Sequence, residues 1–226
     1  MPRRLETFFS GGFYHIFNKT IDQKRVFIDK DFCRHFLKTL TYYRSSRSSQ
    51  SFSEVRNLPR EEQLKIDKIV SHRKYFLADV LAYCLMPTHF HLLIKQLMDD
   101  GLVRFISNTL NSFTRYFNLR SQRRGPLFLP QFRSERITNE SQLIHVSRYI
   151  HLNPYSGEVV KDMTKLKDYP WSSYGEYLDS PRKSSLANTH EILETFGGTR
   201  KRYQKFVEER SDYQKSLEDL KHLSKW

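Results

Sequence analysis

The sequence contains little cysteine and no long apolar run. Its two cysteines, Cys33 and Cys84, stand far apart in a chain of 226 residues. This scarcity excludes a disulfide framework or a zinc finger and predicts a reducing, cytoplasmic environment. No apolar stretch approaches the roughly 20 residues that a membrane-spanning helix needs. Residues 1–6 include arginines but no apolar segment of a secretory signal, so we expect neither export nor membrane insertion.

Acidic residues are also scarce relative to basic ones. Asp and Glu number 25 against 38 Lys and Arg, which gives a formal net charge of +13. This excess favours a polyanionic partner, although many basic proteins bind none in particular. The aromatic content of 14% strengthens the nucleic-acid hypothesis, because Phe, Tyr and Arg are the side chains on which unpaired bases stack.

The order of the expected elements predicts an α+β fold. Apolar runs predict strands over residues 11–20, 75–86, 89–96 and 127–137, and a three-to-four spacing predicts helices over 29–44, 101–120 and 140–152. The Asn153-Pro154 pair is expected to end the last of these helices. The resulting order is typical of an antiparallel sheet with helices packed on one of its faces.

Two segments fall outside this pattern. Residues 45–74 begin with a serine-rich stretch, continue into a helix expected to start at Pro59, and are interpreted as an insertion. From residue 179 the chain contains a Ser-Pro-Arg-Lys-Ser-Ser linker, a short helix near 190–196 and a charged helix that reaches Trp226. We therefore predict a domain over residues 11–178 and a helical accessory tail over 179–226.

His89 and His91 form the most informative motif. They stand two apart in an apolar, strand-like run directly after a Pro-Thr turn. Because successive side chains of a strand point to opposite faces, both imidazoles project from one face, while Phe90 and Leu92 face the other. Two neighbouring imidazoles on a rigid strand can ligate one divalent metal. A His-x-His pair alone is more often a pair of surface or core histidines than a metal site.

Tyr149 and Asn153 stand four residues apart and share a helical face. A tyrosine phenol can attack a phosphodiester and hold it covalently, provided that the phosphate is neutralised and placed in line. A metal held by His89, His91 and the side-chain oxygen of Asn153 would supply the neutralisation. The ordinary alternatives are that Tyr149 packs in the core and that Asn153 only ends the helix.

Arginines are frequent around these motifs, with few acids between them. They are interpreted as residues that track a DNA phosphate backbone, and they are Arg104, Arg115, Arg120, Arg123, Arg124, Arg133, Arg136 and Arg148. Among the other histidines, His15 and His151 are interpreted as structural, whereas His145 could either assist the chemistry or pack.

Five ordered motifs resemble a known family. They are Gly12 with Tyr14-His15 and Asn18, the run 82–94, Gly125 with Leu127-Phe128, the run 148–154, and Trp171-Ser172-Ser173-Tyr174. Over about residues 11–178 the chain resembles the IS200-like single-tyrosine transposases of the HUH nuclease superfamily. Within that family it is most similar to the branch of REP-associated tyrosine transposases.

The resemblance implies a ferredoxin-like HUH fold, a divalent metal (Mg²⁺ or Mn²⁺) and cleavage of single-stranded DNA beside a hairpin. It gives His89 and His91 the places of metal ligands, and gives Tyr149 the place of the nucleophile that forms a 5′-phosphotyrosine. Asn153 stands where insertion-sequence members carry a glutamine ligand. Monomer and homodimer both stay open, because the tyrosine helix completes its own site in some members and the partner's site in others.

Three other functions also stay open. A non-catalytic protein of the same fold could bind DNA or RNA hairpins as a regulator. A rolling-circle initiator or relaxase would share the fold, but such proteins usually carry helicase or primase regions, for which 226 residues leave little room. A metal hydrolase with a water nucleophile would cleave DNA without using Tyr149.

Overall fold

A sheet of four antiparallel strands forms the centre of the computed structural model, which describes residues 7–179, 185–209 and 211. The strands are β1 (Phe13–Lys19), β2 (Ala78–Met86), β3 (His89–Gln96) and β4 (Arg133–Ile137), and their spatial order is β2-β3-β1-β4. Every pair of neighbours is antiparallel. With its packed helices, the sheet confirms the predicted α+β fold.

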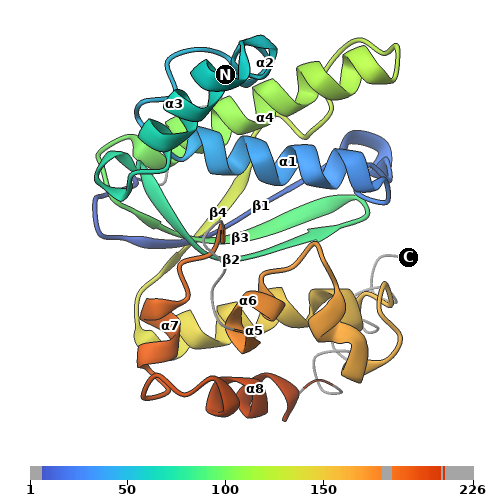
Figure 1. Cartoon of the computed structure of the whole chain (residues 1–226). Helices are drawn as coiled ribbons and strands as arrows, with labels where there is room; N and C mark the ends of the chain where they lie inside the picture. The colour runs from blue at the N-terminus through green and yellow to red at the C-terminus, as the bar shows by residue number, and fades with distance from the viewer. Residues whose placement is uncertain (1–6, 180–184, 210, 212–226) are drawn as a thin grey trace.

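Helices cover both faces of this sheet (Figure 1). One layer holds α1 (Lys30–Tyr43), α2 (Phe52–Asn57), α3 (Arg60–Val70) and α4 (Gly101–Arg120), and the other holds α5 (Glu140–Ser156), α6 (Tyr174–Leu178), α7 (His190–Glu194) and α8 (Arg200–Glu208). Short 3₁₀ helices span Ile21–Gln23, Arg73–Tyr75 and Met163–Asp168. The prediction of helices on one face is therefore wrong, because the strands carry apolar side chains on both faces.

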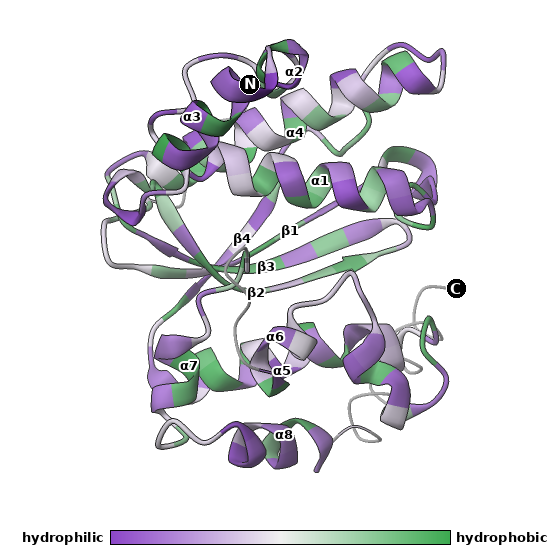
Figure 2. Ribbon diagram, viewed as in Figure 1, coloured by the Kyte–Doolittle hydropathy of each residue, from purple (hydrophilic) through white to green (hydrophobic). Residues whose placement is uncertain are grey.

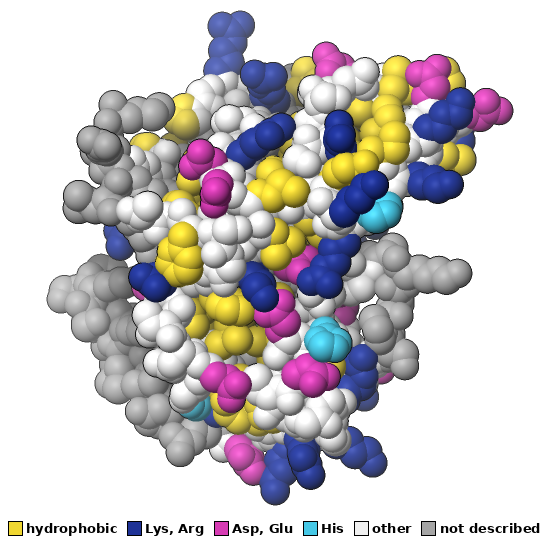
Figure 3. Space-filling view, turned by 90° about the vertical axis from the view of Figure 1, so that its left-hand side faces the viewer, with side chains coloured by type: hydrophobic (Ala, Val, Ile, Leu, Met, Phe, Trp, Pro, Cys, Tyr) yellow, Lys and Arg dark blue, Asp and Glu magenta, His cyan; other side chains and the backbone are white. Residues whose placement is uncertain are grey.

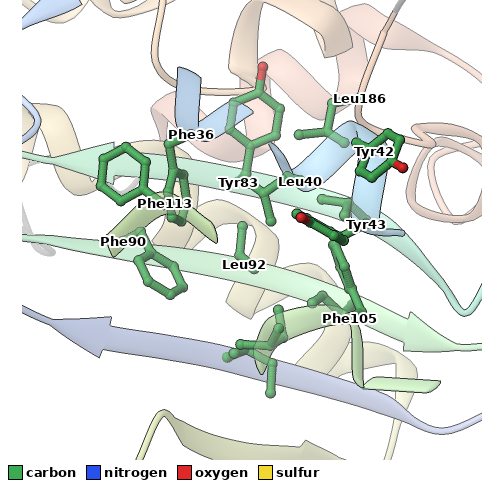
Figure 4. Close-up of a cluster of buried hydrophobic side chains, with 14 of the residues drawn as sticks. Phe36, Leu40, Tyr42, Tyr43, Tyr83, Phe90, Leu92, Phe105, Phe113 and Leu186 are labelled. Atoms are coloured by element: carbon green, nitrogen blue, oxygen red, sulfur yellow. The ribbon is translucent and has the colours of Figure 1, made fainter. Parts of the chain in front are cut away.

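Each face of the sheet has its own apolar core. Toward α1 and α4, strand residues such as Phe90 and Leu92 pack against Phe36, Leu40 and Phe113 (Figure 4). Toward the second layer, Cys84 and Leu93 pack against residues such as Ile150, Tyr177 and Tyr203. Strand β2 is buried along its whole length, so its sequence is almost continuously hydrophobic instead of alternating (Figure 2).

The expected bounds hold for β3 and α4 but not for β4 and α5. Strand β4 covers only 133–137, because Pro130 lacks an N–H and the preceding segment makes only local contacts near the end of β1. These are the N–H of Leu129, which donates to the Lys19 carbonyl, and an isolated bridge between Thr20 and Phe128. Helix α5 does not end at Asn153 and runs to Ser156, with Pro154 inside. The last turn forms because its carbonyls accept hydrogen bonds from later residues. The N–H of Gly157, for example, donates to the backbone carbonyl oxygen of Asn153 at 2.8 Å.

The predicted insertion, residues 45–74, contributes no strand to the sheet and contains α2 and α3. The helix expected at Pro59 starts at Arg60, with Pro59 as its N-cap. In the predicted tail, α7 and α8 pack against α5 and the sheet. The rest of the charged helix expected to reach Trp226 lies outside the described residues. Within the described ranges, every helix is too short or too polar to cross a bilayer.

A buried polar network connects α8 to α5. Nδ1 of His151 lies 2.6 Å from Tyr203 Oη, and its Nε2 lies 2.7 Å from Ser173 Oγ. Tyr203 Oη also lies 3.1 Å from Ser147 Oγ. Burial lowers the pKa of His151 to about 3, so the ring is neutral and its two nitrogens serve the network. His151 therefore has a structural role, as its position in the sequence suggested.

We expect this network to make folding sensitive to acid. The pKa of His151 is about 3 in the folded chain, against an ordinary value of 6.5, so the unfolded chain takes up the proton first. Stability is therefore fully present above about pH 6.5 and falls as the pH drops toward 3, by up to roughly 1.4 kcal/mol per pH unit for this group. Burial also lowers the pKa of His35 to about 4, so His35 contributes to the same loss of stability as the pH falls.

Urea unfolding between about pH 7.5 and pH 5 measures this dependence. The conservative variant His151→Gln keeps hydrogen-bonding capacity without a titrating ring, so its free energy of unfolding should depend less on pH than that of the wild type. Equal pH dependence in both proteins would assign the acid sensitivity to other groups.

Candidate active site

Strands β1 and β3 bring three histidines to the sheet face that α5 covers. In the register of the pair, His91 lies opposite Phe17 and His89 lies opposite Lys19, so His15 and Lys19 share the face of the histidine pair. The rings of His89 and His91 lie 5.1 Å apart. Phe90 is buried in the core on the other face, as the strand alternation predicted.

Helix α5 places Tyr149 against these histidines. The centroid of its ring lies 5.5 Å from that of His91 and 5.9 Å from that of His15, in edge-to-face contact with both. Tyr149 is only partly buried, whereas Ile150, the next residue on α5, is fully buried in the core. The tyrosine therefore lies at the boundary between the core and the cavity below α5.

That cavity has a volume of about 1090 Å³ and contains the predicted site. Its lining includes His15, His89, His91, Tyr149 and Asn153, and also the charged side chains Lys19, Arg25, Glu135 and Glu158. The structure thus brings together the predicted nucleophile and all three predicted metal ligands, although they come from one strand and one helix more than 50 residues apart in sequence.

Asn153 is oriented by its own helix. Its side chain is almost fully buried, and Nδ2 donates a hydrogen bond to the Tyr149 carbonyl oxygen at 2.7 Å. Because the amide nitrogen is used in this bond, the amide oxygen is the atom that could contact a metal ion. The residue therefore acts both as part of the last turn of α5 and as a candidate ligand.

His15 connects the histidine pair to an acid. Its Nε2 lies 2.9 Å from His91 Nδ1, with the two rings stacked at 5.1 Å, and its Nδ1 lies 3.6 Å from the Glu135 carboxylate. If the Nδ1–H of His15 faces Glu135, Nε2 of His15 can accept a hydrogen bond from Nδ1–H of His91. Burial lowers the pKa of His15 although Glu135 opposes the shift, which favours the neutral ring that this arrangement needs.

The donor set fits a divalent cation that keeps some of its water. Nδ1 of His89 lies 3.0 Å from Thr88 Oγ1 and that of His91 contacts His15, so a metal would bind each ring at Nε2. No group of three or more His, Cys, Asp or Glu among the described residues is arranged to hold a metal. Two imidazoles and one amide oxygen leave positions for water and phosphate oxygens, the ligands that Mg²⁺ and Mn²⁺ take.

The predicted DNA-binding arginines do not form one cluster. Arg104, Arg115 and Arg120 belong to α4, which lies on the sheet face opposite Tyr149 (Figure 1). Within β4, Arg133 and Arg136 pair with Phe17 and Tyr14, residues on opposite faces of β1, so they also face opposite layers.

Three further arginines of the set differ in what they contact. Arg123 donates to Asn118 Oδ1 at 2.9 Å and to the Pro126 carbonyl at 2.6 Å, which shapes the turn in which Arg124 is exposed. Arg148 faces α8, with its guanidinium 4.4 Å from the centre of the Phe206 ring and 2.8 Å from His145 Nδ1. His145 is absent from the described lining of the cavity, so it does not join Tyr149 there.

Lys19 and Arg25 are cavity residues that the sequence reasoning did not select. Lys19 faces the cavity because it pairs with His89, and Arg25 reaches it because the N–H of Phe27 donates to the Pro87 carbonyl at 3.1 Å. The alternation of β1 could have placed Lys19 on the face of His15. No local pattern marks Arg25, since its position depends on a contact between distant turns.

A histidine pair on a central strand lies below a tyrosine helix. The fold that holds them, an antiparallel sheet between two helical layers, is consistent with the HUH transposase fold. A structure of a REP-associated tyrosine transposase bound to a REP hairpin shares it, with a TM-score of 0.52 and 17% sequence identity, covering 78% of this chain and 84% of that one. No protein-family model matches the sequence, and no curated protein shows significant sequence similarity to it. The likeness therefore establishes the fold alone.

Proposed function

We propose that the protein is a metal-dependent single-stranded DNA endonuclease and strand transferase of the IS200-like, REP-associated type, acting at DNA hairpins through Tyr149. The observation that carries the proposal is the contact of the Tyr149 ring with His91 in the cavity that also contains His89 and Asn153. The shared fold with a tyrosine transposase bound to a REP hairpin supports it.

The residues of the cavity have separate tasks in this reaction. His89, His91 and Asn153 would hold Mg²⁺ or Mn²⁺, which when bound neutralises the scissile phosphate. Tyr149 Oη forms a bond to phosphorus while the bond from phosphorus to the 3′ oxygen breaks, and the proton lost by the phenol is balanced by the proton gained by the leaving 3′ oxygen. One phosphate ester replaces another, so a 3′-hydroxyl of a second strand can reverse the step without an external energy source.

The charges of the cavity explain why a metal would be needed. Lys19 and Arg25 line it, but so do Glu135 and Glu158. The carboxylates offset the two cations, and the protein alone therefore supplies little net positive charge to a phosphate there. A divalent ion beside Tyr149 would provide the missing charge where the phosphate must be bound.

The proposal is tested with end-labelled DNA hairpins that carry single-stranded flanks, taken from the DNA next to the gene. They are incubated with protein and Mg²⁺ or Mn²⁺, and the products are separated on a denaturing gel. We expect label that migrates with the protein and that disappears when a chelator is added. Binding with neither cleavage nor adduct would instead favour a hairpin-binding regulator of the same fold.

DNA affinity is expected to fall steeply with salt. The net charge of +13 predicts that binding releases counterions from the DNA. If about four phosphates are neutralised, the dissociation constant should rise roughly 100-fold between about 50 and 200 mM salt. A titration by fluorescence anisotropy measures the slope. A flat response would show that the basic surface does not bind the DNA.

A further inference from the structure

The predicted insertion borders two adjoining cavities that lie outside the candidate active site. The first, of about 580 Å³, lies between the end of α1, the loop at 47–50, α3 and the 3₁₀ helix Arg73–Tyr75. The second, of about 390 Å³, lies between α1, the same loop and α4. Ser49 and Gln50 line both cavities, so the two adjoin at this loop. We call them together the insertion groove.

The groove is positively charged. Arg47, Lys68 and Lys74 line the first cavity and Arg115 lines the second, whereas none of the described lining residues is Asp or Glu. Asp67, the acid of α3 nearest to this lining in sequence, is paired with Arg56 at 2.5 Å. The described lining thus holds no carboxylate, in contrast to that of the candidate active site, although Asp67 and Glu54 lie close enough to help raise the pKa of Tyr42. Figure 3 looks onto this end of the molecule, where Lys and Arg side chains lie among apolar and acidic ones over the α1–α4 layer.

Two of these cations contact the same aromatic ring. The Arg47 guanidinium lies 4.7 Å from the centre of the Tyr75 ring, and the Lys74 ammonium lies 4.8 Å from it. A hydrogen bond from Lys74, together with the charges of Lys74 and Arg47, lowers the pKa of Tyr75. Because the cations already share one platform, two successive phosphates could bind them with little loss of side-chain freedom.

The uncharged lining suits an unpaired nucleotide better than a duplex. Ile66 and Ile69 offer apolar surface to the face of a base, beside the hydrogen-bonding side chains of Ser49 and Gln50. The second cavity adds further amides and hydroxyls, including Asn108, Asn111 and Ser112. Base faces are exposed only in single strands, since a duplex buries them in its stack.

The first cavity of the groove and the candidate active site lie at opposite ends of the sheet. The N–H of Leu77 donates to the Arg44 carbonyl, and that of Leu97 donates to the Leu77 carbonyl, which places the first cavity at the Gln96 end of β3. His89 is at the other end of this eight-residue strand. At about 3.3 Å per residue the first cavity and the histidine pair are separated by roughly 25 Å. The second cavity lies against α4, on the sheet face opposite Tyr149. A nucleotide in the groove is therefore distinct from those beside Tyr149.

We propose that the insertion groove binds single-stranded nucleic acid, several nucleotides away from the phosphate that Tyr149 attacks. The inference rests on the proposed function for the identity of the partner, but it requires neither Tyr149 nor a metal ion. It also gives a role to Arg115, which the fold separates from the tyrosine.

Fluorescence anisotropy with two labelled DNAs tests the groove: a bare hairpin, and the same hairpin with a single-stranded tail of about 15 nucleotides. In the double variant Arg47→Glu with Lys74→Glu we expect the affinity for the tailed hairpin to fall at least about tenfold, and that for the bare hairpin to change much less. The matched control is Arg60→Glu with Lys65→Glu, which makes the same charge change at exposed positions of α3 outside the groove.

Equal losses of affinity for the tailed hairpin in the two double variants would contradict binding in the groove. They would show only a general effect of charge. A duplex tail bound as tightly as the single-stranded one would overturn the preference for unpaired nucleotides. Tails that carry 5-bromodeoxyuridine should photocrosslink to peptides within residues 35–75 or 108–119, and crosslinks exclusively elsewhere would contradict the assignment. Failure of the Tyr149 reaction would not affect these results, because each of them measures binding without cleavage.

Discussion

Replacement of Tyr149 by phenylalanine is expected to eliminate the covalent protein–DNA adduct and to reduce cleavage at least about 1000-fold, with hairpin affinity changed less than about threefold. The phenyl ring keeps the edge-to-face contacts with His91 and His15, at 5.5 and 5.9 Å, so the cavity keeps its shape. Only the oxygen that would attack phosphorus is lost. Loss of chemistry with retained binding is the result that a nucleophile predicts.

Tyr155→Phe is the matched control, since Tyr155 is a partly buried tyrosine of the same helix that is absent from the described lining of the cavity. We expect this variant to form the adduct at close to the wild-type rate. Adduct and cleavage are measured on denaturing gels, and affinity by anisotropy on the same hairpin. Cleavage that persists in Tyr149→Phe would show that water is the nucleophile and that the tyrosine is not required.

The parts of the candidate site that could be predicted from the sequence depend on local geometry. His89 and His91 share a face because a strand alternates, and Tyr149 and Asn153 share a face because four residues make about one helical turn. Sequence periodicity could not show that α5 lies on the same side of the sheet as the two histidines. The resemblance to a transposase family implied this relation, and the structure now provides it.

The arginines show where sequence proximity misleads. Arg104 and Arg115 precede β4 and Arg148 follows it, yet α4 and α5 lie on opposite faces of the sheet. The side of the sheet that a helix covers depends on how the connecting loops cross its edge, and charge patterns carry no information about this. In the same way, Arg25 reaches the cavity because two turns that are distant in sequence contact each other.

The end of α5 was mispredicted for a related reason. A proline argues against continuing a helix, and Asn153-Pro154 therefore looked like an end. The rule considers the hydrogen bond that proline loses, but not the bonds that the next residues supply. Here Ser156 Oγ donates to the Leu152 carbonyl at 3.1 Å and the N–H of Gly157 to that of Asn153. One more turn forms, and Asn153 remains inside the helix with its side chain held below Tyr149.

The sequence reasoning considered His15 structural, and the geometry gives that role a consequence for metal binding. We expect His15 to be a positioning residue for His91, because the contact of 2.9 Å between its Nε2 and His91 Nδ1 fixes which nitrogen of His91 faces a metal. His15→Ala removes the acceptor and the stacked ring that hold His91 in orientation. The affinity for Mn²⁺ should therefore fall roughly 10- to 100-fold, the usual effect of losing such a partner.

Titration of the DNA-free protein with Mn²⁺, followed by electron paramagnetic resonance of the unbound ion, measures this affinity without relying on cleavage. His15→Gln offers an amide oxygen that can accept from His91 Nδ1–H, so we expect it to recover most of the affinity lost in His15→Ala. His145→Ala is the control, because His145 is exposed, contacts Arg148 and is not among the described residues that line the cavity. If His15→Ala binds Mn²⁺ as tightly as the wild type, the orientation of His91 does not depend on His15. If His145→Ala loses as much affinity, the effect of His15 is a general one on the fold.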